Sequence, residues 1–146
     1  MPFSVCYYHV IWTTKNRADL LTPAIEKIVL ASIRETSKTI HSPIEALNGC
    51  ENHIHVAVHI ALSLSISQWV KRIKGTSSFE VNKAYPDGDK FRWQGSYGVL
   101  TFGAKQLPFV TEYILRQKEH HRANALQPYL EETGSDDEER SVDSDE

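Results

Sequence analysis

The sequence predicts an α+β fold of the ferredoxin-like (RRM-like) class, an antiparallel sheet that carries helices on one face. Segments with strand and helix patterns follow one another in the order β-α-β-β-α-β-α, without an internal repeat. This order is typical of the split βαβ arrangement, extended here by one C-terminal helix. The chain has 146 residues, which is enough for one compact domain and too few for two.

The first two elements are expected to be a buried strand and an amphipathic helix. Residues 3–12 are rich in aromatic and β-branched side chains, which favour a strand. The polar and basic residues 13–17 then form a loop that leaves the sheet. Thr22 and Pro23 supply a cap and a first-turn proline, so we expect a helix that begins there and ends near Thr39.

A hairpin is expected to follow this helix. The sequence His-Ser-Pro at residues 41–43 breaks the helix, and residues 44–47 are long enough for a short strand. Asn48 and Gly49 have the composition of a tight turn, which predicts that the chain reverses there. The returning strand then runs through residues 49–60.

The returning strand carries the pattern His-x-His. Side chains alternate between the faces of a strand, so His53 and His55 project from one face. The apolar residues of the strand project from the other face: Ile54, Val56, Val58 and Ile60. If these apolar residues meet the covering helices, the two imidazoles lie on the open face of the sheet.

The second half of the domain is expected to add a helix, an irregular strand and a final helix. Trp69, Val70 and Ile73 fall on one helical stripe, and the helix pattern continues to about Lys83. Residues 91–102 mix aromatic side chains with glycines, which predicts an irregular edge strand. The final helix is expected over approximately residues 107–123.

The last thirteen residues differ in composition from the rest of the chain. Residues 134–146 contain seven acidic residues and one Arg, so they carry a net charge of −6 and bury little apolar surface. We therefore expect a folded domain at residues 1–133 and an acidic disordered tail at 134–146. Because the whole chain has a formal charge of −3, the domain carries +3, which is compatible with an anionic partner.

The chain is expected to be a soluble, cytoplasmic protein that does not enter a membrane. Its N-terminal residues lack the pattern of a signal peptide, and no apolar run approaches the length of a membrane span. Cys6 and Cys50 are expected to be free thiols, because a single disulfide would be unusual in a reducing compartment.

Two residues of the final helix suggest the chemistry that the histidines could support. Tyr113 and Gln117 are four residues apart, so they are neighbours on one ridge of a helix, which is expected to flank the apolar stripe. A tyrosine hydroxyl near a metal ion can attack a phosphate, and an amide oxygen one turn away can complete the coordination of that ion. His53, His55 and Gln117 are therefore candidate metal ligands, and Tyr113 is a candidate nucleophile. This chemistry requires no nucleotide cofactor.

Four motifs, spread over residues 5–123, make the sequence resemble a known family. It is similar to the small single-tyrosine transposases of the HUH nuclease superfamily, which belong to insertion sequences that move as single-stranded DNA. The motifs are Val-Ile-Trp-Thr-Thr-Lys-Asn-Arg at residues 10–17, His-Ile-His at 53–55, Lys-Gly-Thr-Ser-Ser at 74–78, and Tyr-Ile-Leu-Arg-Gln-Lys-Glu-His-His at 113–121. The acidic tail departs from the family pattern.

The resemblance implies a metal-dependent reaction on DNA, a DNA substrate and a homodimer. It implies that His53, His55 and Gln117 bind Mg²⁺ or Mn²⁺, and that Tyr113 cleaves and rejoins DNA through a 5′-phosphotyrosine intermediate. It also implies a substrate of single-stranded DNA with hairpins, and a homodimer in which the tyrosine helix of one subunit could serve the histidines of the other. Phosphate contacts are expected from five basic residues: Lys15, Arg17, Lys71, Arg72 and Lys74.

Other interpretations of the same residues remain open at this point. The protein could be an inactive or domesticated relative that binds DNA or RNA hairpins through the same sheet. Alternatively, the spacings Cys6-x-x-His9 and Cys50-x-x-His53 could form a structural zinc site. Opposite parity of Cys50 and His53 on one continuous strand argues against that site.

Overall fold

The computed structural model describes residues 6–119 together with residues 131 and 133. The elements follow the predicted order, which confirms the α+β fold. They are β1 (Tyr7–Thr13), α1 (Pro23–Thr39), β2 (Ile44–Cys50), β3 (His53–Val58), α2 (Ile66–Ala84), β4 (Gly98–Phe102) and α3 (Leu107–Leu115). Short 3-10 turns, η1 (Lys15–Arg17) and η2 (Ala104–Gln106), follow β1 and precede α3. The acidic tail, His120 and His121 lie outside the described residues.

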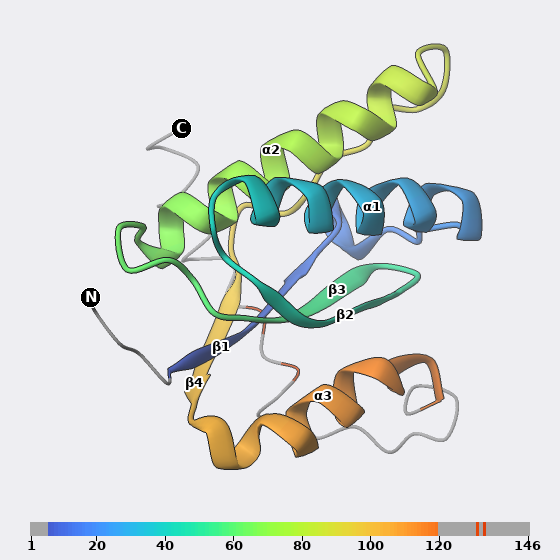
Figure 1. Cartoon of the computed structure of the whole chain (residues 1–146). Coiled ribbons are helices and arrows are strands. Elements are labelled where there is room, and N and C mark those ends of the chain that lie inside the picture. Colours follow the sequence, from blue (N-terminus) through green and yellow to red (C-terminus); the bar gives the residue numbers. More distant parts are fainter. Residues whose placement is uncertain (1–5, 120–130, 132, 134–146) are drawn as a thin grey trace.

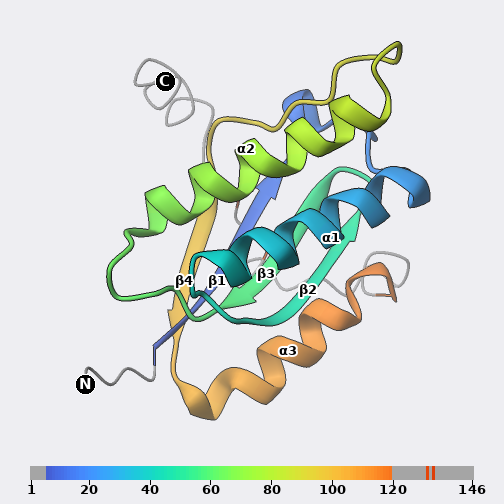
Figure 2. The same cartoon turned by 45° about the horizontal axis from the view of Figure 1, so that its top comes forward.

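The four strands form one antiparallel sheet in the order β2-β3-β1-β4. Helices α1 and α2 lie side by side over one face of this sheet, and α3 lies on the opposite side (Figure 1). The turned view in Figure 2 shows the same arrangement, with α1 and α2 in front of the strands. The two central strands, β3 and β1, are therefore the ones that can carry both a core face and a functional face.

Local capping explains where the two covering helices begin. The side chain of Thr22 accepts a hydrogen bond from the backbone N–H of Ile25, and Pro23 occupies the first turn of α1, as predicted. Ser65 and Gln68 form a reciprocal capping box at the start of α2. Within the described part of the chain, no helix combines the length and the apolar composition needed to cross a bilayer.

The core lies between the sheet and the two covering helices. Trp12 of β1 packs edge-on against Trp69 of α2, with ring centroids 6.2 Å apart. The predicted faces of β3 are confirmed, because Ile54, Val56 and Val58 all belong to this core. Burying such side chains contributes about 1.5–3 kcal/mol each, so this face of the sheet holds the fold together.

The turn of the hairpin lies three residues later than predicted. Asn48 and Gly49 belong to strand β2, and the chain reverses at Glu51 and Asn52, so the prediction of a turn at Asn48-Gly49 is wrong. Gly49 instead allows Ile54 to pack closely against the backbone, because a Cβ at position 49 would lie 2.8 Å from Cδ1 of Ile54. The small size of glycine, rather than its turn-forming ability, explains its presence here.

The moved turn also changes the relation between Cys50 and His53. They are direct partners in the β2–β3 register, so they share a face of the sheet instead of having opposite parity. The parity argument against a zinc site was therefore wrong. The site still finds no support, because the group of metal-ligating side chains among the described residues includes neither cysteine. Cys6 and Cys50 do not form a disulfide.

The last two elements are shorter than predicted. Regular pairing of β4 with β1 begins only at Gly98, and the preceding segment touches the sheet through a single bridge between Trp93 and Thr14. Helix α3 ends at Leu115, where Arg116 leaves the helical conformation (φ −102°, ψ 20°). Residues 117–119 are helical again, and the remainder of the predicted helix lies outside the described residues.

The face of the sheet opposite α1 and α2 is not fully open. Helix α3 packs across β2 and β3, and Val110 and Ile114 bury their side chains against Ala46 and Ala57. As a result, His55 is fully buried and His53 is only 7 % exposed. The two histidines face a narrow space under α3 instead of open solvent.

Candidate active site

Each of the two histidines of β3 is oriented by a hydrogen bond to a neighbouring residue. Asn52 donates through Nδ2 to the carbonyl of Arg17, so its Oδ1 faces Nδ1 of His53 at 2.8 Å. Nδ1 of His53 therefore carries the hydrogen, and Nε2 presents its lone pair. Such a partner on the remote ring nitrogen is what orients metal-binding imidazoles in proteins.

His9 of β1 plays the corresponding role for His55. His9 Nε2 and His55 Nδ1 lie 2.9 Å apart and share a hydrogen bond, with the two rings stacked. Burial and then the neighbouring His55 lower the pKa of His9 to about 3, so His9 is neutral. The bond fixes the His55 ring so that its Nε2 points away from His9, toward the carboxylate of Glu131.

Asn48 holds α3 over this part of the sheet. Its side-chain amide donates to the carbonyls of Ile114 and Leu115, each at 3.1 Å, and so satisfies the free C-terminal carbonyls of the helix. Its Oδ1 also accepts a hydrogen bond from Lys118 at 2.9 Å. These bonds explain why α3 ends at Leu115 and why it is fixed directly above β2 and β3.

Helix α3 brings Tyr113 to the histidines. The ring centroids of Tyr113 and His55 are 6.2 Å apart, and the Tyr113 hydroxyl donates to Glu131 Oε2. Gln117 lies beyond the break at Arg116, yet its Nε2 donates to the same carboxylate oxygen at 3.1 Å. Tyr113 is 4 % exposed and Gln117 is fully buried, so both side chains are packed inside the domain and do not lie on a flank of the apolar stripe, where they were expected.

Glu131 lies at the centre of these groups. Its Oε1 is 3.1 Å from Nε2 of His55 and 3.6 Å from Nε2 of His53, while Oε2 accepts from Tyr113 and Gln117. Burial alone raises the pKa of the Glu131 carboxyl. The hydrogen bond and charge of His55, with Tyr113 and His53, outweigh this effect and lower the pKa to about 2, so the group is a carboxylate.

These residues present donors that suit a divalent cation. The ligating atoms of His53, His55 and Glu131 all lie within 4.8 Å of one another. Among the described residues, the Oε1 atom of Gln117 is buried and has no hydrogen-bond partner. Burying such an oxygen costs free energy unless something binds to it. Two imidazole nitrogens with amide and carboxylate oxygens form a donor set that fits Mn²⁺ or Mg²⁺.

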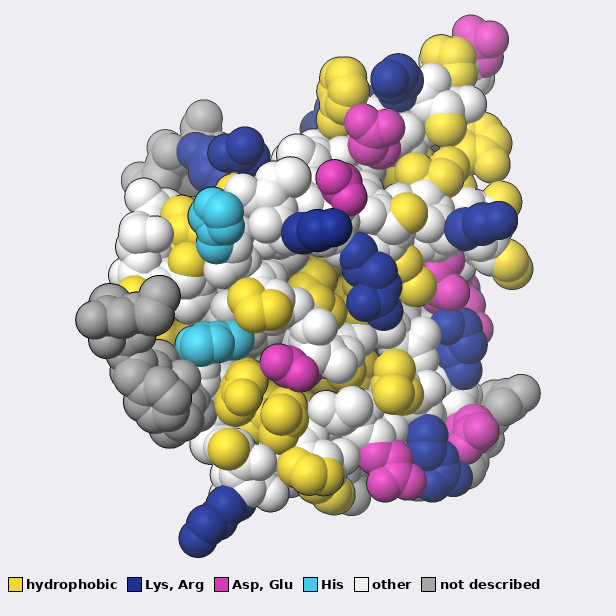
Figure 3. All heavy atoms as spheres, in the orientation of Figure 1, with side chains coloured by type: hydrophobic (Ala, Val, Ile, Leu, Met, Phe, Trp, Pro, Cys, Tyr) yellow, Lys and Arg dark blue, Asp and Glu magenta, His cyan; other side chains and the backbone are white. Residues whose placement is uncertain are grey.

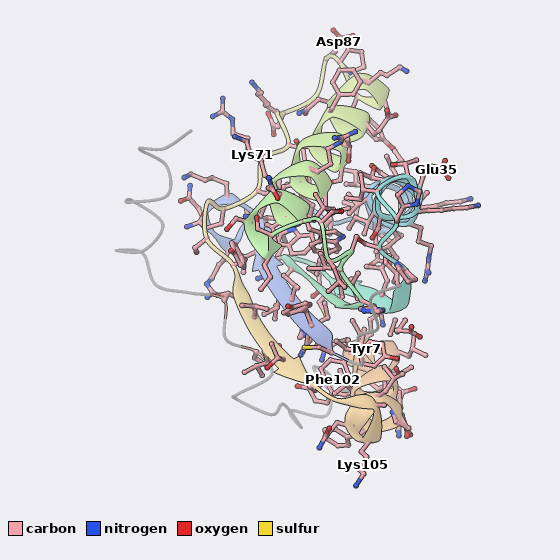
Figure 4. The ribbon with its side chains drawn as sticks, turned by 60° about the vertical axis from the view of Figure 1, so that its left-hand side comes forward. Tyr7, Glu35, Lys71, Asp87, Phe102 and Lys105 are labelled. Atoms are coloured by element: carbon pink, nitrogen blue, oxygen red, sulfur yellow. The ribbon has the colours of Figure 1, made fainter. Side chains whose placement is uncertain are left out.

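The predicted DNA-contacting residues separate into two groups. Lys71 and Lys74 on α2 and Lys15 after β1 line a pocket of about 650 Å³, together with Lys90 and Arg92. The pocket lies between α2 and the connection to β4, and Figure 4 shows Lys71 on this side of the helix. Within it, the ammonium of Lys74 donates to the carbonyls of Gln94 and Ser96, so it ties the two segments together.

Arg17 and Arg72 do not line this pocket. Arg17 donates to the side chain of Thr133 at 2.9 Å, beside the histidine site, and Arg72 is exposed on α2. On the face shown in Figure 3, basic side chains are interspersed with acidic and hydrophobic ones. The pocket, in contrast, gathers five basic side chains: Lys15, Lys71, Lys74, Lys90 and Arg92.

Three other ring-bearing side chains make structural contacts. Trp93 donates to Ser77 and packs edge-on against Trp12, which places it in the core instead of on a base-stacking surface. Tyr97 shares a hydrogen bond with Ser67. His59 packs against Tyr7, outside the His53–His55 group.

Three residues of the site were not predicted from the sequence: His9, Asn52 and Glu131. The alternation of β1 places His9 on the same face as His55, which was a usable signal once strand pairing was known. Asn52 directly precedes His53, but it was expected to lie within a strand. Glu131 is 76 residues from His55 in the chain, and no local pattern links the two.

Comparisons with known proteins show the family of this chain. The family model of IS200-like transposases matches residues 2–117. The chain is 27% identical over 123 residues to the ISDra2 transposase TnpA of Deinococcus radiodurans, covering 75% of this chain and 82% of that protein. It is 26% identical over 122 residues to the IS200 transposase of Salmonella typhimurium, covering 80% of each.

Two solved structures have the same fold. A Deinococcus radiodurans protein assigned as a transposase superimposes with a TM-score of 0.63 at 24% identity, covering 80% of this chain and 95% of that one. A REP-associated tyrosine transposase bound to a REP hairpin superimposes with a TM-score of 0.61 at 16% identity, covering 83% and 71%. The predicted resemblance is confirmed, and the chain belongs to the family of IS200-like transposases, whose members act in DNA transposition.

Proposed function

We propose that this transposase cleaves and rejoins single-stranded DNA with Tyr113 as the nucleophile. The observation that carries the proposal is the convergence of the Tyr113 hydroxyl and the Nε2 atoms of His53 and His55 on one carboxylate, Glu131. A protein that only bound DNA would need no such group of residues. The inactive binding protein considered above is therefore the less favoured function.

The proposed reaction is a transesterification. The oxygen of Tyr113 attacks a backbone phosphorus, the bond from phosphorus to the 3′ oxygen breaks, and a 5′-phosphotyrosine and a free 3′-hydroxyl result. The tyrosine proton moves to the departing 3′ oxygen through acid–base groups of the site. Rejoining is the reverse reaction with another 3′-hydroxyl, so the energy of the broken bond is retained in the tyrosine ester.

We further propose that His53, His55 and Gln117 hold a divalent ion, Mg²⁺ or Mn²⁺, which would act as a Lewis acid at the phosphate. The orphaned Oε1 of Gln117 supports its assignment as a ligand. The chain's own residues contribute orientation: Asn52 and His9 fix the imidazoles, and Asn48 fixes the helix that carries Tyr113. Because Tyr113 lies over the histidines of its own chain, the geometry favours cleavage in cis.

The proposed DNA path uses the basic pocket. Lys15 and Lys71 line it, and Arg17 lies at the end of β1 next to the histidine site, so phosphates bound there would lie near the nucleophile. The hairpin bound by the REP-associated relative supports a hairpin substrate for this chain as well. A homodimer is also proposed, and light scattering of the purified protein would test it.

A covalent trapping experiment tests the proposed function. The protein is incubated with end-labelled single-stranded hairpin DNA and Mn²⁺, and the products are separated on a denaturing gel. Wild type is expected to form a protein–DNA adduct, and Tyr113→Phe is expected to bind DNA without forming one. The matched control is Tyr85→Phe, because Tyr85 is exposed and lies outside the site. An adduct that persists in Tyr113→Phe would refute the assignment.

A further inference from the structure

Glu131 comes from a chain segment beyond α3 that the family model does not cover, since the match ends at residue 117. We propose that Glu131 is a direct ligand of the divalent ion, forming a His-His-Glu set with His53 and His55. We also propose that its second oxygen holds the Tyr113 hydroxyl beside the ion. This inference rests on the proposed metal-dependent function, and it adds a residue that the sequence motifs do not contain.

The separations of the candidate ligand atoms support this assignment. Oε1 of Glu131 is 3.1 Å from Nε2 of His55 and 3.6 Å from Nε2 of His53. In an octahedral site with bonds of about 2.1 Å, neighbouring ligand atoms are about 3 Å apart. The three atoms are therefore close to the spacing that one shared ion requires, and small side-chain movements would complete it.

The orientation of the two histidines supports the same conclusion. The hydrogen bond from Nδ1 of His53 to Asn52 leaves Nε2 of His53 as the metal-binding atom. In the same way, the hydrogen bond between His9 and Nδ1 of His55 leaves Nε2 of His55 for the metal. Both remaining Nε2 atoms point at the same carboxylate oxygen of Glu131. A carboxylate oxygen is also a preferred ligand of Mg²⁺ and Mn²⁺.

The second oxygen of Glu131 links the ion site to the nucleophile. Oε2 accepts hydrogen bonds from the Tyr113 hydroxyl and from Nε2 of Gln117. One carboxylate therefore sets the position of the attacking oxygen relative to both histidines. Gln117 orients this carboxylate through its amide nitrogen, which leaves its Oε1 free to bind the same ion.

The segment that carries Glu131 is anchored two residues later. Thr133 is 7 % exposed, accepts a hydrogen bond from Arg17 through its hydroxyl, and accepts another from Ser96 through its carbonyl. These bonds tie Thr133 to Arg17, which follows β1, and to Ser96, which precedes β4. Glu131 is thus delivered to the site by a built contact rather than by a chance approach of an exposed side chain.

The test measures metal binding without DNA. Mn²⁺ is titrated into the full-length protein, and free Mn²⁺ is followed by electron paramagnetic resonance. Glu131→Gln keeps the size of the side chain and its ability to bond Tyr113, but it removes the charged ligand, so Kd is expected to rise about tenfold or more. Glu112→Gln is the matched control, because Glu112 is exposed and its carboxylate bonds to Arg116. Its Kd is expected to equal that of wild type.

A His53→Ala protein in the same titration separates two kinds of failure. If wild type binds Mn²⁺, His53→Ala does not, and Glu131→Gln binds within twofold of wild type, Glu131 is not a ligand and only this inference is overturned. If wild type does not bind, or His53→Ala binds equally well, the proposed metal site itself is refuted. Should Glu131→Gln fail to give a folded circular dichroism spectrum, Glu131→Asp replaces it, with the same expected direction.

A cleavage assay adds a second discriminating outcome. Loss of the ligand is expected to lower cleavage of hairpin DNA in Glu131→Gln at limiting Mn²⁺, with partial recovery at high Mn²⁺. Faster cleavage in Glu131→Gln with an unchanged Mn²⁺ affinity would contradict the proposal. It would mean that the carboxylate blocks the place of a DNA phosphate instead of binding the ion.

Discussion

The two faces of the sheet are built on different principles. On the face covered by α1 and α2, strands β1 and β3 present apolar side chains that pack into one continuous core. On the face under α3, the same two strands present His9, His53 and His55 to Tyr113 and Glu131. Alternation along a strand lets one segment of six residues, β3, serve stability on one side and chemistry on the other.

Because the two faces differ in this way, substitutions on one face should affect stability and substitutions on the other should affect activity. Polar groups buried under α3 are satisfied by one another, and one of them, the Oε1 of Gln117, is left without a partner among the described residues. Among the described residues the core face also holds one such group, the indole N–H of Trp12, and each unpaired buried polar group costs about 1–3 kcal/mol. The α3 face gathers polar side chains where the opposite face gathers apolar ones, so substitutions under α3 are expected to affect activity more than stability.

Substitutions of two neighbouring residues of β3 test whether the two faces have separate roles. His53→Ala is expected to lower DNA cleavage at least about a hundredfold while the protein stays folded, because the ring is a proposed ligand at the end of the strand. Ile54→Ala is expected to cost about 2–5 kcal/mol in free energy of unfolding, because Ile54 is fully buried in the core. Cleavage assays and urea denaturation measure both. Equal effects of the two substitutions on stability would contradict the separation of the faces.

The pH dependence of stability should also come from the α3 face. The pKa of His9 is lowered from 6.5 to about 3, so below pH 6.5 the unfolded chain binds a proton that the folded protein does not. The contribution of neutral His9 to the free energy of unfolding is therefore complete above pH 6.5 and is lost progressively as the pH falls below that value. For the metal-free protein in EDTA, the free energy of unfolding is expected to fall by up to about 1.4 kcal/mol per pH unit between pH 6 and 5.

This pH slope has a matched control. Urea denaturation of His9→Gln should show a flatter pH dependence, because the titrating ring is gone. His59→Gln should keep the slope of wild type, since His59 packs against Tyr7 outside the site. An unchanged slope in His9→Gln would show that other groups control the acid response.

The attachment of α3 to the sheet should depend on Asn48. Asn48→Ala removes two hydrogen bonds to the C-terminal carbonyls of α3 and one to Lys118. We expect a loss of about 1 kcal/mol in free energy of unfolding and a lower cleavage rate, because Tyr113 is less firmly held over the histidines. Thermal unfolding and cleavage assays would check both effects. Normal cleavage would show that α3 needs no such cap.

The smallest expected effect concerns the basic pocket. Lys71→Gln should weaken DNA binding at low salt and reduce the slope of log K against log salt concentration by about 0.7–0.9, the amount for one phosphate contact. Lys74→Gln should instead lower stability, because its ammonium holds the carbonyls of Gln94 and Ser96. Fluorescence anisotropy at several salt concentrations measures the slope. A slope that Lys71→Gln leaves unchanged would exclude Lys71 from the interface.

Local patterns in the sequence were sufficient to predict most of the fold. The cap at Thr22, the stripe through Trp69 and Ile73, and the alternation around His53 all depend on neighbouring residues, and all are confirmed. The turn was misplaced because Asn48 and Gly49 have turn-like composition. Their real roles, a helix cap and a close packing contact, are tertiary.

The site was predictable only where a motif exists. His53 and His55 were recognised by their alternation and Tyr113 and Gln117 by their spacing, and the structure brings all four together around Glu131. Glu131 itself belongs to a run of ordinary polar residues, and only long-range folding delivers it to the histidines. Residues that act through tertiary contacts leave no local signal, which is why His9 and Asn52 also escaped prediction.

On the face under α3, the oxygen of Tyr113 is the proposed nucleophile that attacks a DNA phosphate. The most direct measurement is mass spectrometry of the adduct formed with hairpin DNA, after digestion of the protein with a protease and of the DNA with a nuclease. We expect the peptide containing Tyr113 to carry the residual nucleotide on that side chain. A nucleotide found on any of the other five tyrosines, or no adduct at all under conditions where the DNA is cleaved, would contradict it.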